Sequence, residues 1–144
     1  MPESSAQEDQ LHATFDDLST TIPATTGRAR NIALWVLQGL LAAFFLAASA
    51  APKLYGEPTA VEIFDEIGVG QWFRYVVGGL EAVGAIGLVI PRVAWLAALG
   101  LAAVMVGAVV TSLFVLNAGL LTLMPLILLV LVGVVAWGRR PRTG

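Results

Sequence analysis

The 144-residue sequence has no cysteine and a single histidine, His12. The absence of cysteine excludes a thiol–disulfide relay, an iron–sulfur cluster held by thiolates and a Cys-based zinc site. Because His12 lies in a polar N-terminal stretch, it cannot ligate a haem within the apolar part of the chain. No Ser-His-Asp or Cys-His constellation can be assembled either. We therefore expect no intrinsic cofactor, no metal site and no catalytic residue, so the chain by itself does not look like an enzyme.

Charge is also scarce. Charged residues make up 12% of the chain and hydrophobic residues 58%, with a mean hydropathy of +0.84. Soluble domains carry about 25% charged residues. The net charge of −2 argues against a nucleic-acid partner. The composition predicts an integral membrane protein whose principal surroundings are a lipid bilayer.

Composition divides the chain into three parts. Residues 1–30 are rich in Ser, Thr and acidic residues and have no basic residue before Arg28, so we predict a disordered acidic tail with at most a marginal helix at 11–18. Residues 31–138 are predicted to form the transmembrane domain, and residues 139–144 a basic tail. The acidic residues of the first segment are Glu3, Glu8, Asp9, Asp16 and Asp17.

Four apolar runs have about the twenty residues that a helix needs to cross a hydrocarbon core. They span residues 32–51, 72–90, 93–116 and 120–137. These runs predict an all-α fold, an integral membrane four-helix bundle. Four crossings place both termini on one side, together with six arginines, against Lys53 and Arg74 on the other. The positive-inside rule then predicts cytoplasmic termini and a bacterial-type plasma membrane location. The six arginines are Arg28, Arg30, Arg92, Arg139, Arg140 and Arg142.

Proline and glycine residues indicate where the predicted helices end or bend. Pro52 discourages straight continuation of the first helix, and Pro125 can kink the fourth. Between the first and second runs we expect a short interfacial helix that ends near Gly68. Thr59 is its predicted N-cap, with Glu62 completing a capping box. This helix is either a plain connector or a lid over a site.

Glu81 is the main functional clue, because an ionised carboxylate in the middle of an apolar run needs a partner, a proton or a cavity. Lys53 and Arg74 are the two candidate cations. Either Glu81 forms a structural clasp with one of them, or the group lines an outward-facing cavity for a small polar ligand, a quinone head group or a proton. The other members of this predicted polar site are Tyr55, Tyr75, Ser112 and Asn117.

Three segments resemble the DoxX-like family of small membrane proteins, namely residues 50–54, 64–68 and 77–88. The discriminating positions are Lys53, Gly68, Glu81 and Gly84, whereas Ala50 stands where the family often has glycine. The resemblance covers about residues 32–137 and implies a four-helix membrane protein. The family is named for a subunit associated with a thiosulfate:quinone oxidoreductase, so the resemblance implies a redox-associated membrane subunit.

Two functions remain open. In the first, the chain is an accessory or assembly subunit of a membrane redox complex, where a partner supplies any quinone. In the second, it is a transport or binding module that uses Glu81 to handle a small molecule or a proton. Small residues four positions apart, such as Ala43 and Ala47, suit close helix packing and are compatible with a homo-oligomer.

Overall fold

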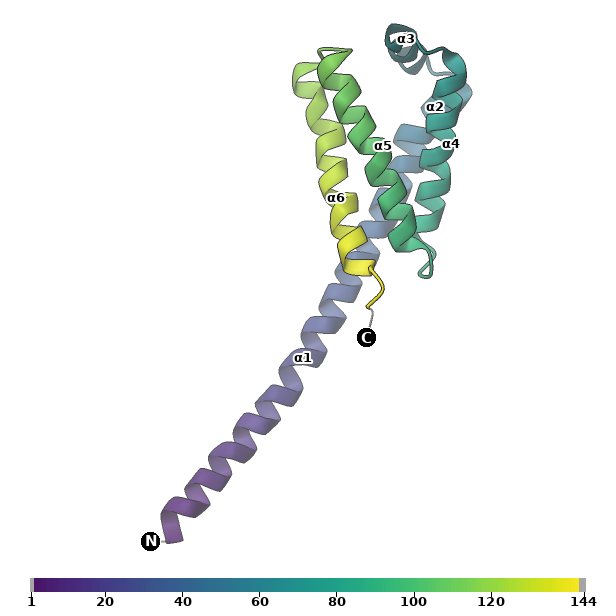
Figure 1. Ribbon diagram of the computed structural model, residues 1–144. Helices are drawn as coiled ribbons and strands as arrows, with labels where there is room; N and C mark the ends of the chain where they lie inside the picture. The colour runs from purple at the N-terminus through teal and green to yellow at the C-terminus, as the bar shows by residue number, and fades with distance from the viewer. Residues whose placement is uncertain (1, 143–144) are drawn as a thin grey trace. The chain divides into compact units, whose positions relative to one another are not determined.

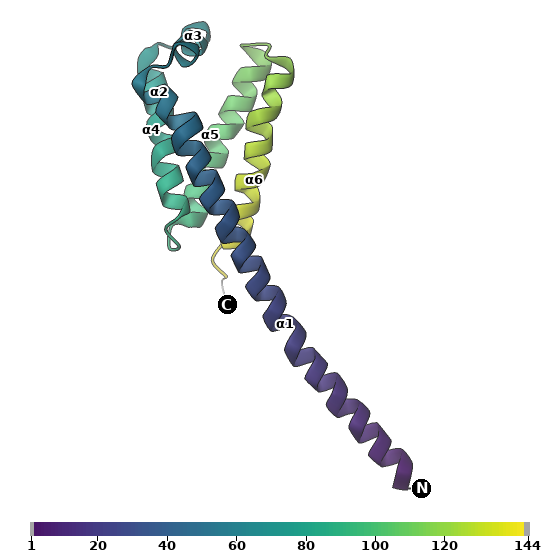
Figure 2. The same cartoon turned by 180° about the vertical axis from the view of Figure 1, so that it is seen from behind.

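The computed structural model describes residues 2–142, with side chains at 3–19 and 26–142. In this part of the chain all regular secondary structure is helical (Figure 1; Figure 2), as the sequence predicted. The elements in chain order are α1 (Pro2–Phe44), the π-helix η1 (Phe45–Ala50), α2 (Ala51–Tyr55), α3 (Pro58–Ile67), α4 (Gln71–Leu88), α5 (Ala94–Phe114), the 3₁₀-helix η2 (Gly119–Thr122) and α6 (Leu123–Arg139).

Within the described residues, three helical stretches are long and apolar enough to cross a membrane, namely Thr26–Tyr55, Ala94–Phe114 and Gly119–Arg139. They overlap three of the four crossings predicted from the sequence. The stretch corresponding to the fourth, α4, has 18 residues and contains Arg74 and Glu81. These two charges lower its hydropathy, and α4 is not among the three stretches.

The described residues up to Leu34 form a unit separate from the rest of the chain. Residues 2–30 lie in α1, which differs from the disordered tail that the sequence predicted. Helix formation is costly to nucleate but cheap to propagate, and here the segment continues directly into an apolar helix that supplies the nucleus. The described side chains from residue 3 to residue 19 are all exposed. At the other end of the chain, Arg139 of the predicted basic tail is the last residue of α6, and residues 143–144 lie outside the described residues.

The first apolar helix does not end at Pro52. It continues through η1 into α2 and ends only at Gly56, which has a left-handed φ of 78°. Proline has no N–H to donate, and its ring clashes with the carbonyl of the residue four positions earlier. A π-turn widens the backbone at this point, so the chain passes the proline without leaving the helical path.

Helix α3 begins two positions earlier than predicted. Its N-cap is Glu57, whose carboxylate accepts hydrogen bonds from the Ala60 amide at 3.2 Å and the Thr59 hydroxyl at 3.1 Å. Pro58 suits the first helical position and shifts the cap away from Thr59. The backbone amides of Thr59 and Ala60 hold the pKa of Glu57 below its usual value. The charged cap is therefore retained at neutral pH and weakens only as the pH falls through that lowered pKa.

The unit that starts at Trp35 has an apolar core to which α1, η1, α4, α5 and α6 contribute. Helix α4 packs against η1, α2 and α5, and α5 packs along α6 (Figure 1). Pro125 lies in the first turn of α6, as the sequence predicted, where a missing N–H costs no intrahelical bond. The fully buried core side chains include Phe45, Ala85, Leu88, Ala98, Leu101, Val132 and Val135.

Glycines allow α4 to approach its neighbours closely. A Cβ atom at Gly84 would lie 2.6 Å from Cγ of Leu101, a residue that is almost fully buried in α5. A Cβ atom at Gly78 would lie 3.0 Å from Cβ of Lys53 in α2. In contrast, Gly79 has no atom within 4 Å of its Cβ position. The α4–α5 and α2–α4 contacts thus depend on the missing side chains of Gly84 and Gly78.

We expect Gly84→Ala to destabilise the protein by about 1–3 kcal/mol, because the added methyl group overpacks the contact with buried Leu101. Gly79→Ala is the matched control on the same helix and should be neutral or slightly stabilising, since Ala is the better helix former. Equilibrium unfolding in detergent micelles measures both. Equal stability of the two variants would contradict the packing described for Gly84.

Candidate functional site

The site is built around an ion pair between Lys53 of α2 and Glu81 of α4. Lys53 Nζ lies 2.8 Å from Glu81 Oε2, and the side chains are 19% and 2% exposed. The close approach of α2 to α4 at Gly78 brings the two helices within reach of this pair. Of the two cations that the sequence left open for Glu81, the structure pairs it with Lys53.

The π-helix completes the environment of Lys53. The Lys53 ammonium also donates to Ser49 Oγ at 2.9 Å and to the Ser49 carbonyl at 3.3 Å. An ammonium group has three N–H donors. Lys53 therefore has one acceptor for each donor, all supplied by Ser49 and Glu81.

Arg74, the other candidate cation, binds groups other than Glu81. It is 4% exposed, and it donates one hydrogen bond to the Lys53 carbonyl and another, of 2.7 Å, to Gln71 Oε1. Its guanidinium carbon lies 4.3 Å from the centre of the Tyr75 ring. Gln71 in turn donates to Asp65 Oδ1 at 2.7 Å and to the Val61 carbonyl at 3.0 Å, both in α3. Arg74 thus ties the end of α2 to α4 and, through Gln71, to α3.

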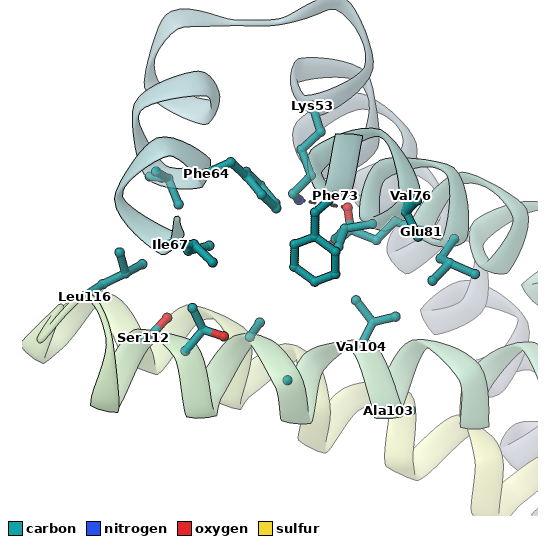
Figure 3. A pocket seen from close by; sticks show the side chains of 16 residues that line it. Lys53, Phe64, Ile67, Phe73, Val76, Glu81, Ala103, Val104, Ser112 and Leu116 are labelled. Atoms are coloured by element: carbon teal, nitrogen blue, oxygen red, sulfur yellow. Dashed lines mark hydrogen bonds and ion pairs between the residues drawn. The ribbon is translucent and has the colours of Figure 1, made fainter. Parts of the chain in front are cut away.

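A pocket of about 460 Å³ lies next to the ion pair. Helices α3, α4 and α5 form its walls, and Lys53 reaches it from α2. Figure 3 shows Lys53 and Glu81 meeting close to the rings of Phe64 and Phe73, with Ser112 on the α5 side. The lining is mostly apolar. Among the described residues that line the pocket, Lys53 and Glu81 are the two with ionisable side chains. Such a combination, an apolar cavity with few polar groups, is typical of small-molecule sites.

The other predicted site residues are dispersed. Ser112 lines the pocket, but Tyr55 and Tyr75 are 73% and 50% exposed and do not. Asn117 adopts a left-handed φ of 47° in the exposed turn after α5, again outside the lining. Sequence reasoning missed Ser49, Gln71 and the lining residues of α3. The signal for Ser49 was its position four residues before Lys53, which places both on one helix face.

A second polar cluster joins other parts of the same unit. Gln38, which is fully buried, donates to the Leu88 carbonyl at the end of α4 and accepts a 2.7 Å hydrogen bond from Arg139 Nε of α6. The Arg139 guanidinium lies 5.1 Å from the centre of the Trp35 ring. This cluster links α1, α4 and α6.

These features define an all-helical protein with segments of membrane-spanning length and an ion pair enclosed by apolar helices. A family model described as the DoxX-like family matches residues 36–135, and the chain belongs to this family. The match includes every helix that lines the pocket. Neither the comparison with curated proteins nor that with solved structures gave a match.

The ion pair can be tested by a double-mutant cycle. We expect Lys53→Met to cost about 3–5 kcal/mol, because it leaves a buried carboxylate without its cation. Adding Glu81→Leu to that variant should restore most of the stability, since a well-packed apolar pair can replace a buried ion pair. Unfolding in bicelles gives the coupling energy. Glu62→Leu, at an exposed position in α3, is the control and should be additive with Lys53→Met. If the changes in unfolding free energy caused by Lys53→Met and Glu81→Leu simply added, the ion pair would be contradicted.

Proposed function

We propose that this DoxX-like protein is a membrane-embedded binding module for a small amphipathic molecule. The apolar body of the ligand occupies the pocket between α3, α4 and α5, and its polar end lies against Lys53 and Glu81. The observation that carries the proposal is an ion pair, almost fully withdrawn from water on the Glu81 side, in the wall of an otherwise apolar cavity of about 460 Å³.

The proposal includes α4 as the fourth membrane crossing, with both termini on the cytoplasmic side of a plasma membrane. Its 18 residues give a length of about 27 Å at 1.5 Å per residue, close to a hydrocarbon core. Its two charged side chains are buried within the protein, whereas an apolar stripe faces outward. A helix of this kind can cross lipid despite modest hydropathy, because its charges do not contact acyl chains. The stripe consists of Val76, Leu80, Val83 and Ile86, all exposed, and its first two members also line the pocket.

We also propose that α3 lies at the membrane interface and covers the pocket. Glu62, Asp65 and Glu66 are exposed, whereas Phe64 is buried and lines the cavity together with Ile67. The helix therefore has one face suited to water and one suited to an apolar ligand. This arrangement supports the lid that the sequence left as an alternative to a plain connector.

Gly107 provides the test, because it lines the pocket and has no atom within 4 Å of its Cβ position. We expect Gly107→Phe to fill the cavity and abolish labelling by photoreactive alkylbenzene probes that end in a hydroxyl or a methyl ether. Labelling in nanodiscs is mapped by mass spectrometry to peptides of α3 and α4. Gly100→Phe is the matched control: Gly100 lies two turns earlier on α5, is exposed and has equal space around its Cβ position.

The Gly100→Phe variant should be labelled like the unmodified protein. Equal labelling of the two variants, or no labelling of the unmodified protein by either probe, would contradict the binding function.

A second function, the accessory subunit of a membrane redox complex, is supported by a separate surface. Leu11, Phe15 and Leu18 are all exposed and recur at i, i+4 and i+7, so they share one face of α1. The same segment has five acidic residues and no basic one before Arg28. Such a helix suits the apolar groove of a basic partner protein. In this proposal any quinone belongs to the partner.

We expect replacement of Leu11, Phe15 and Leu18 by Ser to remove partner proteins that co-purify from native membranes, because the apolar anchors are lost. Quantitative mass spectrometry of the purified complex measures this. Ala6→Ser with Ala13→Ser, on the far side of the same helix, is the control and should retain the partners. Unchanged co-purification in the triple variant would exclude this surface as the interface.

A further inference from the structure

We infer that the pocket selects an uncharged ligand whose polar end donates a hydrogen bond, such as an alcohol or a phenol, and that Glu81 is the acceptor. The inference rests on the binding function proposed above. It assigns the ligand class from the hydrogen-bonding capacity that remains at the ion pair.

All three N–H donors of the Lys53 ammonium group are already used in hydrogen bonds. Its three N–H groups are matched by Ser49 Oγ, the Ser49 carbonyl and Glu81 Oε2. A ligand carbonyl or carboxylate that sought a hydrogen bond from Lys53 would have to displace one of these acceptors. Displacing Glu81 would leave its carboxylate without its cation, at a position where this is costly.

The Glu81 carboxylate, in contrast, can accept further hydrogen bonds. A carboxylate offers about four lone-pair sites. Among the described residues, the hydrogen bond assigned to Glu81 is the single one from Lys53 to Oε2. Since Glu81 lines the pocket, its remaining acceptor sites are available to a ligand that enters it. A hydroxyl donor there would form a charge-assisted bond, which is stronger than one between neutral groups.

The charge of the pocket favours a neutral ligand. Lys53 and Glu81 cancel each other, so neither an ammonium nor a carboxylate gains a net counter-charge. The remaining lining is aliphatic and aromatic apart from the hydroxyls of Thr111 and Ser112 on α5. Among the neighbouring charged groups, Arg74 is committed to the Lys53 carbonyl and to Gln71, and Asp65 of α3 is exposed. Both lie outside the pocket lining.

The experiment is a competition in nanodiscs, with the photoreactive methyl-ether probe as reporter. Unlabelled 4-octylphenol, 4-octylanisole and 4-octylbenzylamine are added as competitors with the same alkyl body. We expect 4-octylphenol to compete about tenfold or more better than 4-octylanisole, which lacks the donor. The benzylamine, which is cationic at neutral pH, should compete less well than the phenol. Equal competition by phenol and anisole would overturn the inference and leave the binding function intact.

The same competition is then repeated with the Lys53→Met, Glu81→Leu double variant. This variant removes the acceptor while keeping the pocket apolar, and it avoids a lone buried charge. In this variant we expect the phenol and anisole to compete equally, with labelling of α3 and α4 retained. A persistent preference for the phenol would assign the acceptor to another group, such as the α5 hydroxyls, and would overturn the role of Glu81. Loss of labelling from the unmodified protein in all arms would instead contradict the binding function itself.

Discussion

A carboxylate that is withdrawn from water must keep a cation beside it, and the local structure around Glu81 follows from this requirement. Gly78 lets α2 approach α4, which brings Lys53 into range. The π-turn before Pro52 supplies Ser49 as a further acceptor for the ammonium group. Arg74 holds the Lys53 carbonyl and so fixes the backbone from which the lysine extends. All three features act on the position or the hydrogen bonding of Lys53.

The helical class and the family were predicted correctly from the sequence. Of the four predicted crossings, three coincide with helical stretches long and apolar enough to span a membrane, because long apolar runs can be read directly from the sequence. Features that depend on which of several neighbouring residues caps or interrupts a helix were predicted less well. Pro52 was expected to discourage straight continuation of the first helix, and the helix passes it by way of the π-helix η1. The N-cap of α3 is Glu57 rather than Thr59. The predicted tail at 1–30 is helical from residue 2, since propagation from an adjoining helix needs no amphipathic pattern.

The candidate site was predicted in its central charges but not in its boundaries. Glu81 and Lys53 stand out because charge is rare in apolar runs. The pocket depends on how α3 folds over α4 and α5, and no spacing in the sequence encodes that arrangement. For the same reason Tyr55, Tyr75 and Asn117 were grouped with the site by their place along the chain, although they do not line the pocket. Phe64 and Gly107, which do line it, look like ordinary packing residues in the sequence.

The π-turn at Phe45–Ala50 also sets the angular phase between the two ends of the first apolar helix. A π-helix has more residues per turn than an α-helix, so the six residues of η1 turn the chain through nearly the angle that one residue fewer would cover in α geometry. If all six residues took regular α geometry, everything beyond them would rotate by about 100°, and Lys53 would leave the face that meets α4. The wide turn therefore accommodates one extra residue and keeps the two ends of the helix in phase.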